Sequence, residues 1–246
     1  ADDIFLLDVI RSCRNAIADF NDLSVVLGLI NQKKHGEVLD AVFIHWSVPK
    51  TDSGLNEYIA SHPDKFDEDG CIAVMNAVSG ISFIGILAIV LKLARNFKKP
   101  ENIMTILTHG FDKISREADT TYLDGRREDF RRRTMLCDEA QRAAEWQKET
   151  LDNFKLIIQK IQEECCHIMK ERLKLPDLLS LLTTVAQAAD PGFSKERKRI
   201  ALLALAESGR NLIADPVQLA EVLQLLYEED RYDFLQKQDV IWREQD

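Results

Sequence analysis

Apolar side chains recur at intervals of three and four residues along most of this chain, which is the period of an amphipathic α-helix. The first such series is Ile4, Leu7 and Ile10. Asp2 and Asp3 precede or open it, and their carboxylates suit a helix N-terminus. No β-branched run that alternates with polar residues is long enough to predict a strand. The pattern therefore predicts an all-α protein.

Prolines, glycines and other turn-forming residues divide the periodic pattern into segments. The clearest helix start is Asp215-Pro216-Val217-Gln218, which combines an N-cap, a proline at the first helical position and a glutamine three residues after the cap. We predict an N-terminal helical bundle over residues 1–124, a long connecting helix over 125–175, and a C-terminal cluster of short helices over 176–246. The predicted helices cover residues 2–20, 22–31, 37–46, 55–62, 70–97, 101–116, 126–174 and 177–189, and three more begin near 195, 216 and 232.

The 22 residues from Gly70 to Leu91 carry no charge. A stretch of this length reaches the roughly 20 residues that a membrane span requires. Polar and flexible positions such as Asn76 and Gly85 lie within it, however, and the rest of the chain is strongly polar. A helix that is apolar on all sides is also typical of the central helix of a bundle. We expect this second structure, and membrane insertion of residues 70–91 is the alternative.

The long predicted helix carries a series of apolar residues with the a and d spacing of a coiled-coil heptad. Such a narrow seam suits another long helix. It extends over about two and a half heptads, fewer than the three or four that a sustained coiled coil needs. Two hypotheses fit it: a helical hairpin within the chain, or a seam for self-association or for a partner helix. The predicted seam residues are Leu151, Phe154, Ile158, Ile161, Cys165 and Ile168.

An arginine cluster lies at the start of the same predicted helix. Its members are Arg126, Arg127, Arg131, Arg132 and Arg133. Guanidinium groups bind phosphates and carboxylates bidentately, and Phe130 offers a stacking face for a base. Glu128 and Asp129 oppose this hypothesis, because each precedes an arginine by four residues, which favours ion pairs on the helix surface. We expect a solvated, self-paired helix start, and an anion or nucleic-acid site is the alternative.

The distribution of charge further restricts the choice of partner. The chain has 32 basic and 41 acidic residues and a formal net charge of −9. Residues 1–70 hold 6 basic and 13 acidic side chains, whereas residues 71–99 hold 4 basic and no acidic ones. An acidic surface repels polyphosphates. General nucleic-acid binding is therefore disfavoured unless arginines gather locally.

No pattern of residues indicates catalysis, a metal site or a cofactor. Glu164 and His167 have the E-x-x-H spacing used in di-iron bundles, but the sequence holds no second such motif. Cys165 and Cys166 are adjacent, so they point to different helix faces and cannot form half of a zinc site. Phosphate-binding and dinucleotide-binding glycine motifs are absent from the sequence. We expect no enzyme activity, no cofactor and no metal.

These patterns favour a non-enzymatic interaction or assembly protein, such as an adaptor, a scaffold, or a viral matrix or nucleocapsid-type structural protein. It would act by self-association or by docking a partner helix. The alternatives are a membrane-associated protein that inserts residues 70–91 and a nucleic-acid-coating assembly protein that uses Arg126–Arg133. The odd number of cysteines, five, and the lack of a secretory signal in the first twenty residues favour the cytoplasm, with the nucleus or a membrane surface as other options.

Overall fold

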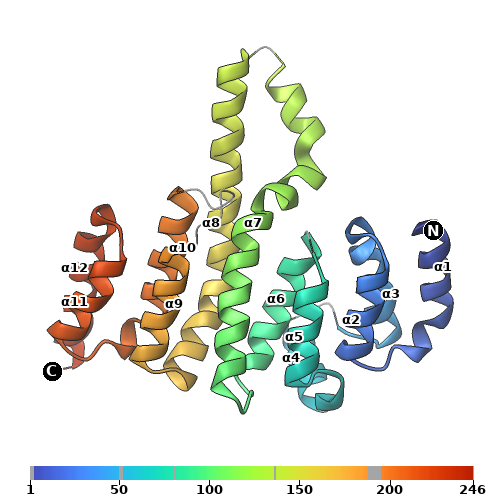
Figure 1. Cartoon of the computed structure of the whole chain (residues 1–246), viewed down its shortest axis with the longest axis horizontal. Coiled ribbons are helices and arrows are strands. Elements are labelled where there is room, and N and C mark those ends of the chain that lie inside the picture. The colour runs from blue at the N-terminus through green and yellow to red at the C-terminus, as the bar shows by residue number, and fades with distance from the viewer. Residues whose placement is uncertain (1–2, 50–51, 80, 136, 188–194, 246) are drawn as a thin grey trace. The chain divides into compact units, whose positions relative to one another are not determined.

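The computed structural model of the chain describes residues 3–49, 52–79, 81–135, 137–187 and 195–245, without the side chains of residues 52–53, 56, 81, 115–128 and 243–245. Over these ranges the chain forms twelve α-helices, four short 3-10 helices and no strands, which confirms the predicted all-α class (Figure 1). The α-helices are α1 (Asp3–Cys13), α2 (Phe20–Leu29), α3 (His35–His45), α4 (Asp52–Ser61), α5 (Glu68–Ala77), α6 (Ile81–Ala94), α7 (Pro100–Arg133), α8 (Glu139–Arg172), α9 (Leu175–Gln187), α10 (Lys195–Ser208), α11 (Pro216–Leu225) and α12 (Glu228–Gln245).

The chain separates into two compact units, Ala1–Ile106 and Leu107–Asp246. Helices α1 to α6 and the first turns of α7 belong to the first unit, and the remaining helices belong to the second. The three segments predicted from the sequence, 1–124, 125–175 and 176–246, have other boundaries and stay a prediction.

An aromatic cluster forms part of the core of the first unit. Phe20 of α2 meets Phe66 edge-on, with the ring centroids 4.8 Å apart, and Trp46 lies 6.1 Å from the same Phe66 ring. The indole N–H of Trp46 donates a hydrogen bond to the Ile17 carbonyl at 2.9 Å. A buried indole needs such an acceptor. The bond therefore ties the end of α3 to the segment that precedes α2.

The uncharged stretch forms two helices, so the prediction of one helix over residues 70–97 is wrong. Helix α5 ends at Ala77 and α6 begins at Ile81. Next to this break, the Ser79 backbone N–H donates to Nδ1 of the buried His35 at 3.2 Å. Nε2 of His35 lies 3.0 Å from the Leu27 carbonyl oxygen, which assigns the ring proton to Nε2. One histidine thus joins the end of α2, the start of α3 and the segment between α5 and α6.

Helix α6 supplies the central apolar helix of the predicted fold. Its side chains Phe83, Ile86, Leu87 and Val90 are at most 1% exposed. It packs against α3 and α5, while α2 packs along α5 and α1 contacts α3. None of the described helices is at once long enough and apolar enough to cross a membrane.

In the second unit, the predicted long helix is confirmed over Glu139–Arg172 but starts later than expected. Helix α7 continues through Gly125 to Arg133, where the sequence predicted a loop before residue 126. Helix α8 begins after a capping box, in which the Asp138 side chain accepts from the Gln141 backbone N–H at 2.8 Å. Residues 126–133 therefore belong to α7, and α7 and α8 form a hairpin (Figure 1).

The shorter helices of the second unit form a series of contacts that starts at α8. Helix α10 packs along α8 and α9, and α9 contacts α11. The predicted start of α11 is confirmed, since the Asp215 side chain accepts from the backbone N–H groups of Val217 and Gln218, each at 2.9 Å. Arg199 of α10 holds Asp230 of α12 through two hydrogen bonds of 2.8 Å.

Candidate functional site

The predicted seam of the long helix lies inside the protein. Phe154, Ile158, Ile161 and Ile168 are at most 3% exposed, and Leu151 is half-buried. Helix α10 packs along α8. Side chains that are already covered by their own chain offer no contact surface to another one. In the structure these side chains therefore pack within the chain, as one of the two hypotheses expected, and a role of the seam in self-association or partner binding stays a prediction.

Only the N-terminal third of α8 lies outside this packing. From Glu139 to Lys148, every side chain except that of Trp146 is exposed. Trp146 meets Phe130 of α7 edge-on, with the ring centroids 4.8 Å apart. This pair joins α7 to α8. Because Phe130 is buried, it does not provide the stacking face that the sequence suggested.

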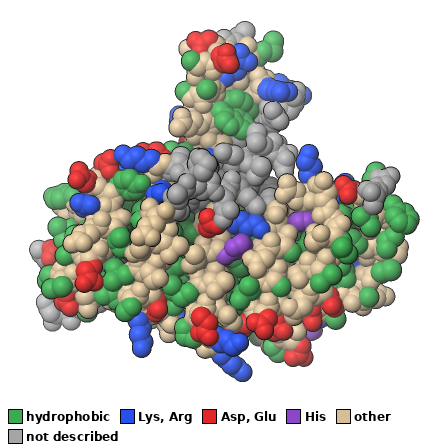
Figure 2. Space-filling model, in the orientation of Figure 1, with side chains coloured by type: hydrophobic (Ala, Val, Ile, Leu, Met, Phe, Trp, Pro, Cys, Tyr) green, Lys and Arg blue, Asp and Glu red, His purple; other side chains and the backbone are tan. Residues whose placement is uncertain are grey.

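The arginine cluster lies on the same hairpin. Arg131, Arg132 and Arg133 are exposed, and the side chains of Arg126 and Arg127 lie outside the described residues. Nη1 of Arg133 lies 2.7 Å from Oε1 of Glu149, across the hairpin. Basic and acidic side chains are interspersed on the projecting end, at the top of Figure 2. The described part of the cluster therefore shares its surface with acids, which weakens its attraction for a polyanion.

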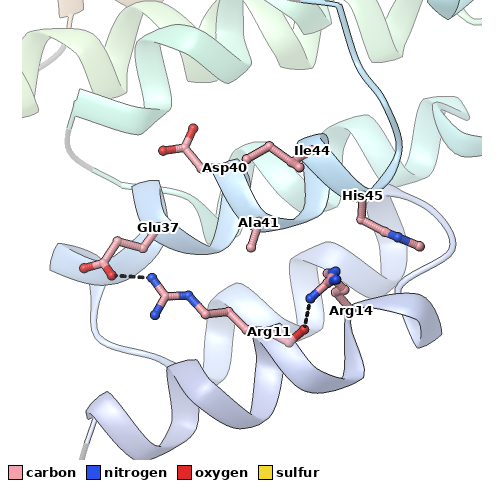
Figure 3. A pocket seen from close by; sticks show the side chains of 7 residues that line it. All are labelled: Arg11, Arg14, Glu37, Asp40, Ala41, Ile44 and His45. Carbon is pink, nitrogen blue, oxygen red and sulfur yellow. Dashed lines mark hydrogen bonds and ion pairs between the residues drawn. The ribbon is translucent and has the colours of Figure 1, made fainter.

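A groove of about 660 Å³ lies between α1 and α3 in the first unit (Figure 3). We call it the α1–α3 groove. Helix α1 and the 3-10 turn that follows it (Arg14–Ala16) form one wall, and α3 forms the other. The α3 residues that line it recur at helical spacing, so they share one face of that helix. The lining residues are Arg11, Arg14, Glu37, Asp40, Ala41, Ile44 and His45.

The arginines of the groove are held by acceptors of the chain itself. Nη2 of Arg11 lies 3.0 Å from one carboxylate oxygen of Glu37 and so joins the two walls. Nζ of Lys34 lies 2.6 Å from the other oxygen. The hydrogen bond from Lys34, assisted by the charges of Lys34 and Arg11, lowers the pKa of Glu37. Arg14 donates to the Arg11 carbonyl oxygen at 2.7 Å.

Two side chains of the groove are left without such neighbours. Ile44 is 70% exposed, and Asp40, one helical turn before it, is also exposed. Within the described part of the chain, the Asp40 carboxylate has no hydrogen-bond or ion-pair partner. In Figure 3 both side chains point away from α1, whereas Ala41 points toward it. Helix α3 therefore presents an apolar side chain and an unpaired carboxylate on one exposed edge.

No motif in the sequence predicted this groove. One signal was present: Val42, Phe43 and Ile44 are three consecutive apolar residues in a predicted helix. Consecutive helical residues point in directions 100° apart, so a single buried stripe cannot cover all three. Val42 is buried, Phe43 is half-buried and Ile44 is exposed. Such a run predicts a second apolar face but does not show whether the chain itself covers it.

A smaller hollow of about 320 Å³ in the second unit is explained by the fold. It lies among the ends of α9 and α11 and the starts of α10 and α12. Two of its cations bind backbone carbonyls: Lys198 donates to Ala186 at 3.2 Å, and Arg231 donates to Leu226 at 3.0 Å. Cations in these positions satisfy the free carbonyls of helix C-termini.

The buried cysteines are poor candidates for reactive groups. Burial raises the pKa of the Cys71 thiol and of the Cys165 thiol far above the ordinary value. The nucleophile and the metal ligand is the thiolate, which these thiols do not form at neutral pH. No group of three His, Cys, Asp or Glu side chains with metal-binding geometry occurs among the residues that the structure describes.

Comparison with known proteins gives no match, because no protein-family model, no curated protein and no solved structure is significantly similar to this chain.

Proposed function

We propose that the protein is a non-enzymatic interaction protein whose α1–α3 groove docks an amphipathic helix of a partner protein. The observation that carries this proposal is the uncovered face of α3, where Ile44 is 70% exposed beside a groove of about 660 Å³. Partner helices commonly bind in such grooves through anchors at positions i, i+3, i+4 and i+7.

The spacing of the α3 residues favours a helix as the occupant. Glu37, Asp40, Ala41 and Ile44 occupy positions i, i+3, i+4 and i+7 of one helix face. The small side chain of Ala41 permits close approach, and packed helices lie about 8 to 10 Å apart. Full burial of an isoleucine side chain contributes about 1.5 to 3 kcal/mol. Ile44 is therefore the expected anchor of the interaction.

Helix α1 adds apolar area on the same unit. Ile4, Phe5 and Val9 are each more than 40% exposed, and Leu7 is the one fully buried residue of this helix among those described. A stable interface buries about 800 Å² on each partner. A partner that covers both the groove and the outer side of α1 would approach this area more closely than one that covers the groove alone.

We do not extend the proposal to membrane insertion or to nucleic-acid coating. The stretch 70–91 is divided between α5 and α6, and most of its large apolar side chains are buried. On the hairpin, Arg133 pairs with Glu149. Neither feature offers an uncovered surface comparable to that of α3.

Site-specific photo-crosslinking in the cells that produce the protein tests this proposal. A photoreactive amino acid replaces Ile44 in one variant. In the matched control it replaces Val25, which is 65% exposed on α2 and lies outside the groove. We expect a discrete crosslinked protein from position 44 and little or none from position 25. Equal products from both positions, or none from position 44, would contradict the proposal. The mass of the adduct distinguishes a second copy of this chain from another protein.

A further inference from the structure

We infer that the α1–α3 groove selects a basic amphipathic helix, with a lysine or arginine placed opposite Asp40. This inference rests on the proposed function and goes beyond it by naming the chemistry of the partner. It follows from the pairing of Glu37 with Arg11 and Lys34 and from the unpaired carboxylate of Asp40.

Two of the cations around the groove, Arg11 and Lys34, are already paired with acids of the chain. Arg11 pairs with Glu37 at 3.0 Å and lies 3.6 Å from an oxygen of Asp8. Lys34 pairs with Glu37 at 2.6 Å. Arg14 donates to a backbone carbonyl at 2.7 Å. An acidic partner would have to compete with Glu37 for Arg11 and for Lys34, which reduces its gain from binding.

The negative charge of Asp40 is available. This carboxylate is exposed and has no partner within the described residues. Asp40 and Ile44 are separated by one helical turn, and their side chains lie on the same edge of α3 (Figure 3). A partner helix that places an apolar side chain on Ile44 therefore brings a side chain one turn away close to Asp40. A lysine or arginine at that position completes the ion pair.

The net negative charge of residues 1–70 also favours a basic partner. Residues 1–70, which include both walls of the groove, carry 13 acidic and 6 basic side chains. A region of one predominant sign attracts ligands of opposite charge and raises their association rate, and salt weakens this effect. We therefore expect a basic helix to associate faster than an acidic one at low ionic strength.

Two synthetic 18-residue peptides test the inference on the full-length protein. Both carry leucines at the same helical spacing, and the polar positions are all lysine in one and all glutamate in the other. Backbone amide shifts of the isotope-labelled protein locate the binding site, and titration gives the affinity. The variants are Asp40→Asn, Ile44→Glu and, as a matched loss of one exposed acid elsewhere in the first unit, Asp64→Asn.

We expect the lysine peptide to shift amides of α3 and to bind more tightly than the glutamate peptide. An exposed ion pair changes affinity by about two- to fivefold, so Asp40→Asn should weaken the lysine peptide by this factor. Asp64→Asn should change its affinity less. The preference for the lysine peptide should also decrease as salt is added.

The possible failures are distinguishable. Equal binding of the two peptides at the groove, or equal losses in Asp40→Asn and Asp64→Asn, would overturn the inference and leave the proposed function standing. If neither peptide shifts amides of α3, or if Ile44→Glu leaves the binding of both unchanged, the docking groove itself is contradicted. Circular dichroism of each variant verifies that it is folded.

Discussion

Side chains that are distant in the sequence decide where several helices of this protein begin and end. The Glu68 carboxylate accepts from the Lys98 backbone N–H at 2.5 Å and from the Asn102 side chain at 2.7 Å, and it thereby caps the start of α7. His35 similarly accepts from the Ser79 backbone N–H, 44 residues away. Local patterns do not contain such contacts. By contrast, the Asp138 and Gln141 capping box is a local signal whose spacing marks a helix start, but the predicted helix over residues 126–174 runs through it.

Glu68 should make stability depend on pH. Burial alone would raise the pKa of Glu68, but the hydrogen bonds from Lys98 and Asn102 bring it below the ordinary value of 4.5. A carboxylate with a lowered pKa stabilises the folded state above the pKa of the unfolded chain, and this contribution is lost as the pH falls through the folded pKa. We expect Glu68→Gln to lower the free energy of unfolding by about 1 kcal/mol at pH 6.

Urea denaturation of the wild type and of Glu68→Gln between pH 6 and pH 3 measures this effect. The difference between the two proteins should shrink as the pH falls below 4.5, because the wild-type carboxylate becomes protonated. A difference that stays constant over this range would show that the charge of Glu68 contributes nothing.

Gly209 should tolerate no side chain. A Cβ atom at this position would lie 2.6 Å from Cδ2 of the buried Leu178. Overpacking of this kind costs about 1 to 3 kcal/mol, so Gly209→Ala should lower the free energy of unfolding. Gly85→Ala is the control, since a Cβ there meets nothing within 4 Å. Because Gly85 lies inside α6, alanine should stabilise it by about 0.5 to 1 kcal/mol. Equal effects in thermal denaturation would contradict this packing.

At the scale of helices, the sequence predicts type and approximate position better than ends. The 3.6-residue period predicts helices at α8 and α11. The N-cap at Asp215 predicts the first residue of α11 as observed, at Pro216. The sequence predicted no helix between residues 116 and 126, but α7 continues through this segment, including Gly125. A glycine inside a helix costs only about 1 kcal/mol relative to alanine, and favourable packing elsewhere offsets that. The break after Ala77 coincides with a local turn signal, the pair Ser79-Gly80, which the prediction of one helix over residues 70–97 did not use. The Ser79 backbone N–H also donates to His35 at this point.

The seam of α8 provides a test at the same scale. Phe154 is fully buried, whereas Leu156 on the same helix is 57% exposed. Phe154→Asp removes about 3 to 5 kcal/mol of core packing and also buries a charge, so we expect extensive loss of the folded second unit. Leu156→Asp should change the free energy of unfolding by less than about 1 kcal/mol.

Circular dichroism and urea denaturation of these two variants distinguish the hypotheses for the seam. If the Phe154→Asp variant is folded and stable and loses only binding to a partner, the seam is a docking surface and not part of the core. Similar destabilisation by both substitutions would instead show that α8 is covered on both sides.

At the scale of the whole molecule, composition and periodicity were sufficient for the all-α class, and the central apolar helix followed from the uncharged stretch. The candidate site was not predictable in this way. Whether Ile44 is covered depends on how α1 and α3 pack, and the apolar pattern is the same in either case. The seam of α8 is the opposite case, an apolar series that the chain itself covers. Its spacing fitted both a partner helix and a helix of the same chain, and in the structure α10 packs along α8.

The most direct measurement of the proposed function is the affinity of the partner that crosslinks at position 44. Isothermal titration calorimetry should compare the wild type, Ile44→Glu and the control Val25→Glu. We expect Ile44→Glu to bind at least about tenfold more weakly, since a charge would replace the apolar anchor. Val25→Glu should stay within about twofold of the wild type. Equal affinity of Ile44→Glu and the wild type would contradict docking in the α1–α3 groove.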